Sequence, residues 1–255
     1  MLFPGEDTFM KLTVLGSGVF KPRTVRYPSG LALTIGGETV IFDAGCGTFM
    51  RLVEAGINYE KINYIFITHL HIDHTSDLLQ YLWAYHLDRE KDLHLFGPPG
   101  LKRFYKTLTK LAPQFSHLPF KVRVREVDDN DVISLPFCRI EVARTYHVDE
   151  LTSICYKVKA DKKTFGYSGD TGYCERLIEF FRNVDVLVLE CTVLNEQKLK
   201  THLIPRECGE IATKAQVKKL VLTHLDLDLE KVKKQCSENF CGEIIVAEDL
   251  MQIEI

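Results

Sequence analysis

The 255-residue sequence has no apolar run of about 18 residues, the length that a helix needs to cross a membrane. Its first ten residues include Glu6 and Asp7 and no long apolar core, so they do not resemble a signal peptide. The formal net charge of −3 excludes a strongly basic coat for nonspecific binding of nucleic acid. Together these absences predict a cytoplasmic protein without a membrane partner.

The eight cysteines include no Cys-x-x-Cys pair. The two nearest, Cys236 and Cys241, are separated by four residues, which is wider than the usual spacing of a zinc knuckle. Several cysteines lie in apolar segments, where a thiol acts as a small apolar side chain. An even number would also allow disulfides, but a chain of this length without an export signal favours reduced thiols.

No linker or low-complexity segment divides the chain, and 45% hydrophobic and 26% charged residues are typical of a globular protein with a full core. This length is compatible with one large domain, expected to span residues 1–255. Apolar periodicity and turn residues, such as the hairpin pair Gly36-Gly37, delimit the elements. Predicted strands cover 11–15, 31–35, 39–42, 62–67, 93–96, 121–127, 139–145, 153–159, 164–167, 184–189, 220–222 and 243–247, and predicted helices cover 49–55, 75–87, 101–111, 174–182, 205–215 and 229–237.

Two distant segments end alike. Residues 65–70 read Ile-Phe-Ile-Thr-His-Leu, and residues 220–225 read Leu-Val-Leu-Thr-His-Leu. Each is an apolar strand that runs into Thr-His-Leu. This similarity predicts two related sheets, each with a histidine at the same rim, and outer helices would bury such strands on both faces.

The segment 68–74 reads Thr-His-Leu-His-Ile-Asp-His, which concentrates three histidines and one aspartate. At the end of a strand, residues i and i+2 point the same way, so His69 and His71 can bind one metal ion. The chain then turns, and Asp73 and His74 can bind a second ion. Imidazole and carboxylate ligands suit zinc, with manganese and iron as alternatives. A helix-capping role would account for Asp73 but not for three histidines.

The pattern His-x-His-x-Asp-His after an apolar strand resembles the metallo-β-lactamase superfamily. The resemblance extends over nearly the whole chain: it includes Asp43 in Ile-Phe-Asp-Ala-Gly, the isolated His147, Asp170 in Tyr-Ser-Gly-Asp-Thr-Gly, and His224. It implies an α/β fold, a four-layer αββα sandwich with metal ions at one rim of the sheets.

The resemblance also implies a site for two divalent metal ions. Seven side chains would hold them: His69, His71 and His147 at one ion, Asp73, His74 and His224 at the other, and Asp170 between the two. Asp43 would support this site without touching an ion, and Asp73 is also expected to take part in catalysis. The remaining histidines at 86, 94 and 117 have no counterpart and are expected to be ordinary.

Such a site would make the chain a metal-dependent hydrolase. Two close divalent ions lower the pKa of a shared water, so that hydroxide is available at neutral pH. With neutral imidazoles, two carboxylates and a bound hydroxide, the site with its two divalent ions would carry a net charge of about +1 and attract an anionic substrate. A phosphodiester fits, and so does the carboxylate of a thioester, lactone or lactam substrate.

The second half of the chain resembles the ribonuclease Z branch of this superfamily. In that branch a glutamate after an apolar strand and a later histidine form a proton-donating pair, and Glu190 and His202 stand in the matching places. A sugar alkoxide is a poor leaving group and needs a proton, and a carboxylate beside an imidazole favours the charged form that donates one. Without the resemblance, a strand-end surface carboxylate and a residue preceding a helix would explain both positions.

Some features depart from that branch. Its opening loop, Pro-x-Lys-x-Arg-Asn, is Pro-Arg-Thr-Val-Arg-Tyr here, which keeps only Pro22 and Arg26. The stretch between His147 and Asp170 is too short for the arm that grips tRNA. The expected substrate is therefore an RNA 3′ end or a small phosphodiester, with a thioester, lactone or other acyl bond as the alternative, and a vestigial, non-enzymatic binding domain as a third reading. The resemblance also implies a homodimer.

A basic segment leaves two interpretations open. Residues 93–125 contain seven lysines and arginines and no acidic residue, with Phe104 and Tyr105 between them. Such a surface could bind a phosphate backbone. It could equally be a solvated helix face beside an edge strand that positive charges protect from pairing.

Overall fold

The computed structural model of the chain describes residues 9–21, 26–86, 89, 91–111, 113–226 and 228–255. The predicted absence of an export signal at residues 1–8 and the position of Pro22 lie outside this part. Within it, no helix is long and apolar enough to cross a bilayer.

Two seven-stranded mixed sheets form the centre of the fold. In the first sheet the order is β14-β1-β2-β3-β4-β5-β6, antiparallel as far as β3 and parallel beyond it. Its strands are β1 (Met10–Gly16), β2 (Gly30–Ile35), β3 (Glu38–Phe42), β4 (Tyr64–Phe66), β5 (Leu93–Gly97), β6 (Val122–Glu126) and β14 (Gln252–Glu254).

The second sheet has the order β13-β12-β11-β10-β9-β8-β7. Like the first sheet, it consists of a parallel part and an antiparallel part. Strands β10 to β13 are parallel, and β7 to β10 are antiparallel. Its strands are β7 (Val132–Leu135), β8 (Cys138–Thr145), β9 (Ser153–Ala160), β10 (Lys163–Tyr167), β11 (Val186–Glu190), β12 (Lys219–Thr223) and β13 (Glu243–Val246).

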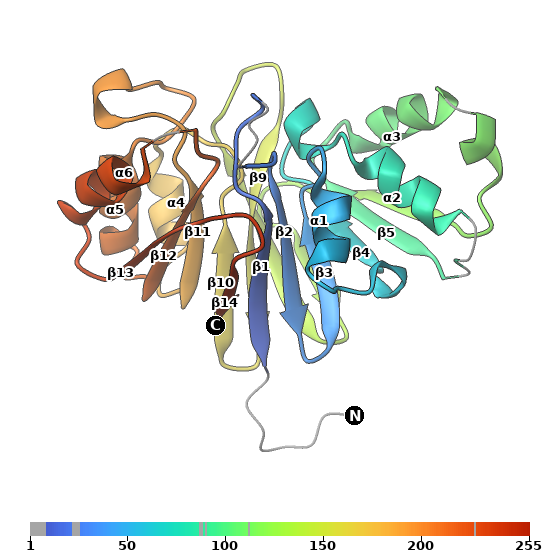
Figure 1. Cartoon of the computed structure of the whole chain (residues 1–255), viewed down its shortest axis with the longest axis horizontal. Coiled ribbons are helices and arrows are strands. Elements are labelled where there is room, and N and C mark those ends of the chain that lie inside the picture. The colour runs from blue at the N-terminus through green and yellow to red at the C-terminus, as the bar shows by residue number, and fades with distance from the viewer. Residues whose placement is uncertain (1–8, 22–25, 87–88, 90, 112, 227) are drawn as a thin grey trace.

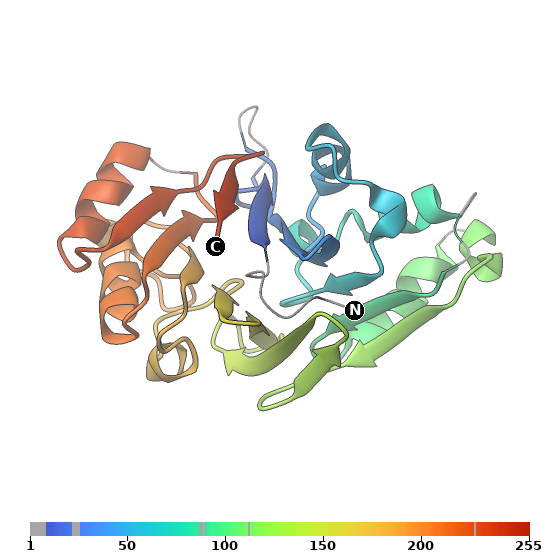
Figure 2. The same ribbon diagram turned by 90° about the horizontal axis from the view of Figure 1, so that it is seen from below.

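Helices cover the outer face of each sheet. Figure 1 shows one group of helices over the first sheet and another group over the second, and Figure 2 shows the sheets between these helical layers. The helices are α1 (Thr48–Glu54), α2 (Leu78–Tyr85), α3 (Leu101–Lys110), α4 (Glu175–Phe180), α5 (Pro205–Lys214) and α6 (Leu229–Ser237). The expected α/β class and the four-layer αββα sandwich are confirmed.

The layers explain why the central strands are apolar on both faces. In β11 every residue is buried. Val186 and Val188 join the core between the two sheets, whereas Leu187 and Leu189 join the core under the second group of helices. A parallel strand covered on both sides loses the alternation of apolar and polar residues that marks a half-exposed strand.

The structure corrects the expected elements in a few places. Strands β7 and β14 were not predicted, because four and three residues are too short to show a period. The helix expected at 75–87 begins only at Leu78, since the chain first forms the 3-10 turn Ile72–His74 and the amide of Asp77 bonds to Ala44 O. The predicted Gly36-Gly37 hairpin is confirmed, with Ile35 opposite Glu38.

The similarity between the two Thr-His-Leu segments has a structural counterpart. Strand β4 lies between parallel neighbours in the first sheet, and β12 lies between parallel neighbours in the second. Thr68-His69 follows the end of β4, and Thr223-His224 stands at the end of β12. Loops after the carboxyl ends of parallel strands are where α/β sheets usually form their sites.

Candidate metal centre

The sequence-predicted ligands all follow strand ends, and the fold brings them to one rim. His69 and His71 follow β4, and the 3-10 turn Ile72–His74 contains Asp73 and His74. From the second sheet come three side chains that follow β8, β10 and β12 in turn: His147, Asp170 and His224. In the described part of the chain these residues form overlapping groups whose ligand atoms lie within 4.8 Å of one another.

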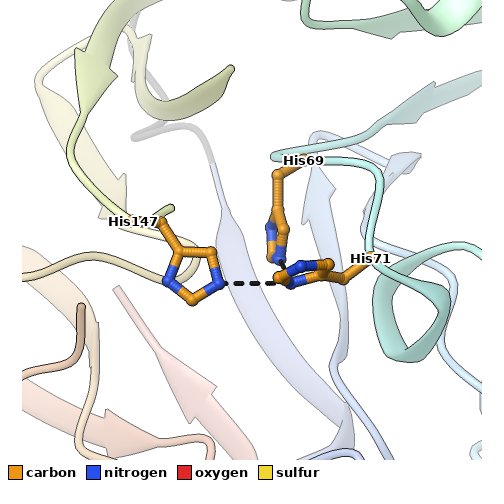
Figure 3. Close-up of side chains that lie close together, drawn as sticks. All are labelled: His69, His71 and His147. Carbon is orange, nitrogen blue, oxygen red and sulfur yellow. Dashed lines mark hydrogen bonds between the residues drawn. The ribbon is translucent and has the colours of Figure 1, made fainter. Parts of the chain in front are cut away.

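Three imidazoles converge in the first group (Figure 3). Nδ1 of His71 lies 3.0 Å from Nε2 of His69 and 3.1 Å from Nε2 of His147. His69 and His147 are buried, and His71 is half-buried. Three nitrogens at this spacing face a common point from two different sheets.

The second group combines two imidazoles with a carboxylate. Oδ2 of Asp73 lies 3.5 Å from Nε2 of His224 and 3.8 Å from Nε2 of His74. His74 is fully buried and His224 nearly so. The 3-10 turn thus directs Asp73 and His74 toward a histidine that is 150 residues further along the chain.

Asp170 lies between the two groups. Its Oδ1 is 3.3 Å from Nε2 of His74, and its Oδ2 is 3.5 Å from Nε2 of His224. The same Oδ2 is 3.9 Å from Nε2 of both His69 and His147. Each carboxylate oxygen therefore faces imidazoles, and one carboxylate reaches both groups.

The side chains present fit divalent cations. Nε2 of His74 and Oδ1 of Asp170 are buried without a hydrogen-bond partner among the described residues. Buried polar atoms normally have partners, so both atoms point to a missing one. Imidazole nitrogen and carboxylate oxygen are donors that zinc, manganese and iron accept. The clusters and the fold therefore indicate a dinuclear site for divalent metal ions.

The protonation of His69 and of Asp170 agrees with this fit, whereas burial would lower the pKa of His74 but Asp170 and Asp43 raise it well above its usual value. Burial, together with the neighbouring His74, holds the pKa of His69 well below its usual value. Burial would raise the pKa of Asp170, but the histidines around it, with His224 and His74 foremost, lower it well below its usual value. Neutral imidazole and ionised carboxylate are the forms that bind metal.

The second nitrogen of most of these histidines is also bound. Nδ1 of His74 lies 2.7 Å from Oδ2 of Asp43, which also accepts from Tyr167 OH at 2.8 Å. Nδ1 of His147 donates to Thr201 O at 2.9 Å, and Nδ1 of His224 lies 2.7 Å from Thr192 Oγ1. Such partners fix the ring and direct its other nitrogen to the ion. Asp43 thus contacts the ring of His74 without belonging to the ligand groups of the described residues.

The expected acid pair is also assembled. Nδ1 of His202 lies 2.7 Å from Oε1 of Glu190. The ring of His202 is centred 4.8 Å from that of His147 and 5.9 Å from that of His224, so it borders both groups. Burial would lower the pKa of His202, but the hydrogen bond and charge of Glu190 outweigh it and raise that pKa.

Several contacts at the site were not foreseen. Thr192 bonds both Glu190 and His224, and Tyr167 bonds Asp43 from the opposite sheet. Both lie in segments that the sequence singled out, but nothing in those segments marks them as partners. The remaining histidines at 86, 94 and 117 lie outside the candidate ligand groups of the described residues.

Two further sequence features have a structural role. Arg26, which the resemblance matched to the opening loop of the ribonuclease Z branch, is buried and donates to Ser17 Oγ and Ala247 O at 2.5 Å each, so it points into the fold. In the basic segment, β6 is an edge strand whose Arg123 and Arg125 are exposed. That arrangement favours the protected-edge interpretation of the segment.

Two facing sheets with histidine and aspartate clusters at a common rim define a metal-dependent hydrolase of the metallo-β-lactamase class. The chain belongs to the β-lactamase superfamily, because a family model described as "Beta-lactamase superfamily domain" matches residues 23–225.

Curated relatives are similar over their whole length. The chain is 27% identical to Ribonuclease Z of Methanothermobacter thermautotrophicus over 299 residues, covering 96% of this chain and 97% of the relative. It is 28% identical to Ribonuclease Z of Pyrococcus horikoshii over 295 residues, covering 96% of each. Both alignments are longer than the 255 residues of this chain, so the relatives contain segments that it lacks.

Solved structures agree on the fold. The human short-form tRNase Z superposes with a TM-score of 0.81 at 25% identity, covering 95% of this chain and 98% of that one. The metallo-β-lactamase fold protein YhfI of Bacillus subtilis superposes with a TM-score of 0.87 at 22% identity, covering 98% and 100%. The likeness to YhfI concerns the fold alone.

Proposed function

We propose that this chain is a phosphodiesterase of the ribonuclease Z type that hydrolyses RNA with two divalent metal ions. Zinc is the proposed metal, with manganese and iron as alternatives that the same ligands accept. The similarity to relatives named Ribonuclease Z supports the assignment, as do the two ligand groups.

The proposed ligands are the seven side chains of the two groups. His69, His71 and His147 would hold one ion, Asp73, His74 and His224 the other, and Asp170 both. When bound, the ions supply a nucleophile at neutral pH and stabilise the negative charge of the reacting phosphate. The chain itself contributes orientation, because Asp43, Thr192 and Thr201 O fix the imidazole rings. Asp73 is proposed to act in catalysis as well as in binding.

The Glu190–His202 pair is the observation that favours phosphodiester cleavage. Backbone amides of Thr171 and Thr192 donate to Glu190 at 2.9 and 3.1 Å, so its carboxylate is fixed beside the imidazole. His202 can then hold a proton at Nε2 and donate it to a departing alkoxide. An enzyme that cleaves a thioester releases a thiol group of low pKa and does not need this donor.

The proposed substrate is an RNA 3′ end or a small phosphodiester. The missing segments relative to the curated relatives, and the short stretch between His147 and Asp170, mean that a large RNA has fewer surfaces to contact. We also propose that residues 1–255 form one domain and that the protein acts in the cytoplasm as a homodimer. The eight free cysteines are compatible with a reducing compartment.

A substrate panel tests the function. Purified protein loaded with zinc, manganese or iron is incubated with an RNA that carries a 3′ extension, with methyl p-nitrophenyl phosphate, and with a series of thioesters. We expect cleavage of the two phosphodiesters and at most trace activity on thioesters. Asp170→Asn should abolish the cleavage, and His94→Ala, a histidine outside the ligand groups, serves as the matched control. Hydrolysis of thioesters alone would contradict the proposal.

A further inference from the structure

An open pocket of about 410 Å³ lies beside the candidate metal centre, and the proposed chemistry does not use it. Its lining consists of Tyr146, Tyr173, Lys198, Leu199, Lys200 and Glu207. The volume falls within the roughly 300–1,000 Å³ that small-molecule sites occupy. Aromatic rings and ammonium groups, rather than aliphatic side chains, dominate this lining.

The pocket is built from the same segments that carry the site. Tyr146 directly precedes His147, and Lys200 lies two residues before His202. The hydrogen bond from His147 Nδ1 to Thr201 O ties these two segments together at 2.9 Å. A group in the pocket would therefore contact the segments that carry His147 of the ligand cluster and His202 of the acid pair.

Gly172 belongs to a third segment, which lies against the segments of Tyr146 and Lys200. Its amide donates to Tyr146 O at 2.5 Å. A Cβ at this position would lie 1.8 Å from Lys200 O and 3.5 Å from Cδ1 of Tyr146. Only glycine allows the three segments to meet so closely, and a larger residue here would push them apart beside the Tyr146 ring.

The two tyrosines differ in what holds them. Tyr173 OH donates to Glu210 Oε1 at 3.0 Å, which fixes that ring in the wall. The side chain of Tyr146 is 45% exposed, and its hydroxyl has no hydrogen-bond partner among the described residues. Tyr146 thus presents a broad apolar ring to solvent at the edge of a polar site, an arrangement typical of a stacking platform.

Of the two lysines, one is likewise held by a partner in the wall and the other is not. Lys198 Nζ lies 2.7 Å from the buried Glu207 Oε1, so its charge is neutralised within the wall. Lys200 is exposed, and within the described ranges no carboxylate pairs with it. The pocket therefore keeps one uncompensated positive charge, which would attract a phosphate.

We propose that this pocket binds the nucleoside next to the scissile phosphate, with its base on the ring of Tyr146 and an adjoining phosphate on Lys200. The inference rests on the proposed function and deepens it, because it makes a nucleic-acid strand the substrate class and disfavours a diester with two small alkyl groups. Any base can stack on an aromatic ring, so the pocket would favour substrates that have a base without distinguishing one base from another.

Binding of nucleotides to metal-loaded protein tests the pocket. Uridine 3′-monophosphate, uridine 5′-monophosphate and methyl phosphate are titrated by calorimetry. Methyl phosphate reports the metal centre alone. We expect at least one uridylate to bind about tenfold or more tightly than methyl phosphate, since base stacking is worth about that factor. In Tyr146→Ala this ratio should fall about tenfold.

Matched variants separate recognition from damage to the fold. Tyr146→Phe keeps the ring and should keep the ratio, and Lys200→Gln should lower uridylate affinity several-fold. Lys233→Gln, on an exposed face of α6, should change neither affinity. Circular dichroism and the urea midpoint of each variant show whether it is folded.

The possible outcomes distinguish this inference from the proposed function. If methyl phosphate and both uridylates bind equally, or if Tyr146→Ala retains the full preference, the pocket does not bind a nucleoside, even when methyl p-nitrophenyl phosphate is hydrolysed. If that diester is not hydrolysed under any metal, the proposed function fails. A uridylate preference that depends on Tyr146 would still establish the pocket in that case.

Discussion

The two halves of the molecule place a buried carboxylate in equivalent positions and use it differently. Asp43 follows β3, the parallel neighbour of β4, and Glu190 ends β11, the parallel neighbour of β12. In each case the neighbouring strand leads into Thr-His-Leu. Both carboxylates are almost completely buried, so each needs hydrogen-bond donors within the protein.

The donors reveal the difference. Asp43 accepts from the amide of Thr68, from Tyr167 OH and from Nδ1 of His74, whose other nitrogen faces the candidate ions. Glu190 accepts from backbone amides and from His202, whose side chain remains 17% exposed. One carboxylate orients a proposed ligand inside the protein, whereas the other charges an imidazole that a substrate can reach. We infer that the same position serves metal binding in one half and proton transfer in the other.

Among variants that keep all seven proposed metal ligands, removing the imidazole of His202 should have the largest effect on kcat. His202→Ala is expected to lower kcat for a diester with an alkyl leaving group by about 10²–10⁴-fold, because the alkoxide loses its proton donor. A p-nitrophenyl ester needs no such donor and should lose far less. Steady-state kinetics on both esters and metal content by atomic absorption measure this. Equal losses on the two esters, with metal still bound, would show that His202 is not an acid.

Asp43→Asn should weaken metal binding and should not affect proton donation to the leaving group. An amide cannot accept all the hydrogen bonds that Asp43 receives, so His74 loses its orientation. Metal affinity, measured by competition with a chelator, should fall by about 10–100-fold. Excess metal should restore much of the activity on both kinds of ester. The exposed Asp161→Asn is the control; unaltered affinity in Asp43→Asn would remove Asp43 from the supporting role.

Glu190→Gln separates charge from position in the second half. The charge of Glu190 raises the pKa of His202 against the opposing effect of burial. Without that charge the pKa of His202 should fall, so the imidazole loses its proton at lower pH. The decline of kcat on the alkaline side, measured with an alkyl diester, should therefore move to lower pH. At a pH above the pKa of His202 in both proteins, kcat should be about tenfold lower for each unit by which that pKa has fallen. An alkaline limb that stays in place would mean that another group supplies the proton.

The sequence predicted those parts of the site that lie close together in the chain or end a strand. His69, His71, Asp73 and His74 occupy one short segment, and the strand period alone pairs the first two. The apolar strand before His224 indicated that this residue lies at a rim, whereas the place of Asp170 came from the resemblance. Their assignment to particular ions came from resemblance, because the spacing between distant segments contains no geometric information.

Contacts between distant segments could not be predicted. The bond between Thr192 and His224, the burial of Arg26 and the pocket beside Tyr146 all depend on how loops meet after the sheets have formed. Loop conformation is set by tertiary packing, which a single sequence does not encode as a local period. The Thr-His-Leu similarity illustrates the limit, because identical letters end two strands but make different bonds.

The two threonines of that similarity provide the finest comparison. Thr68 Oγ1 donates to Asp43 Oδ2 at 2.9 Å, whereas Thr223 Oγ1 is buried without a partner among the described residues. Thr68→Val should lower the free energy of unfolding by about 1–3 kcal/mol, since it leaves a buried carboxylate short of a donor. Thr223→Val removes only an unpaired hydroxyl and should be neutral or stabilise by about 1 kcal/mol. Urea unfolding of the metal-free variants measures both, and equal destabilisation would mean that the two strand ends are equivalent after all.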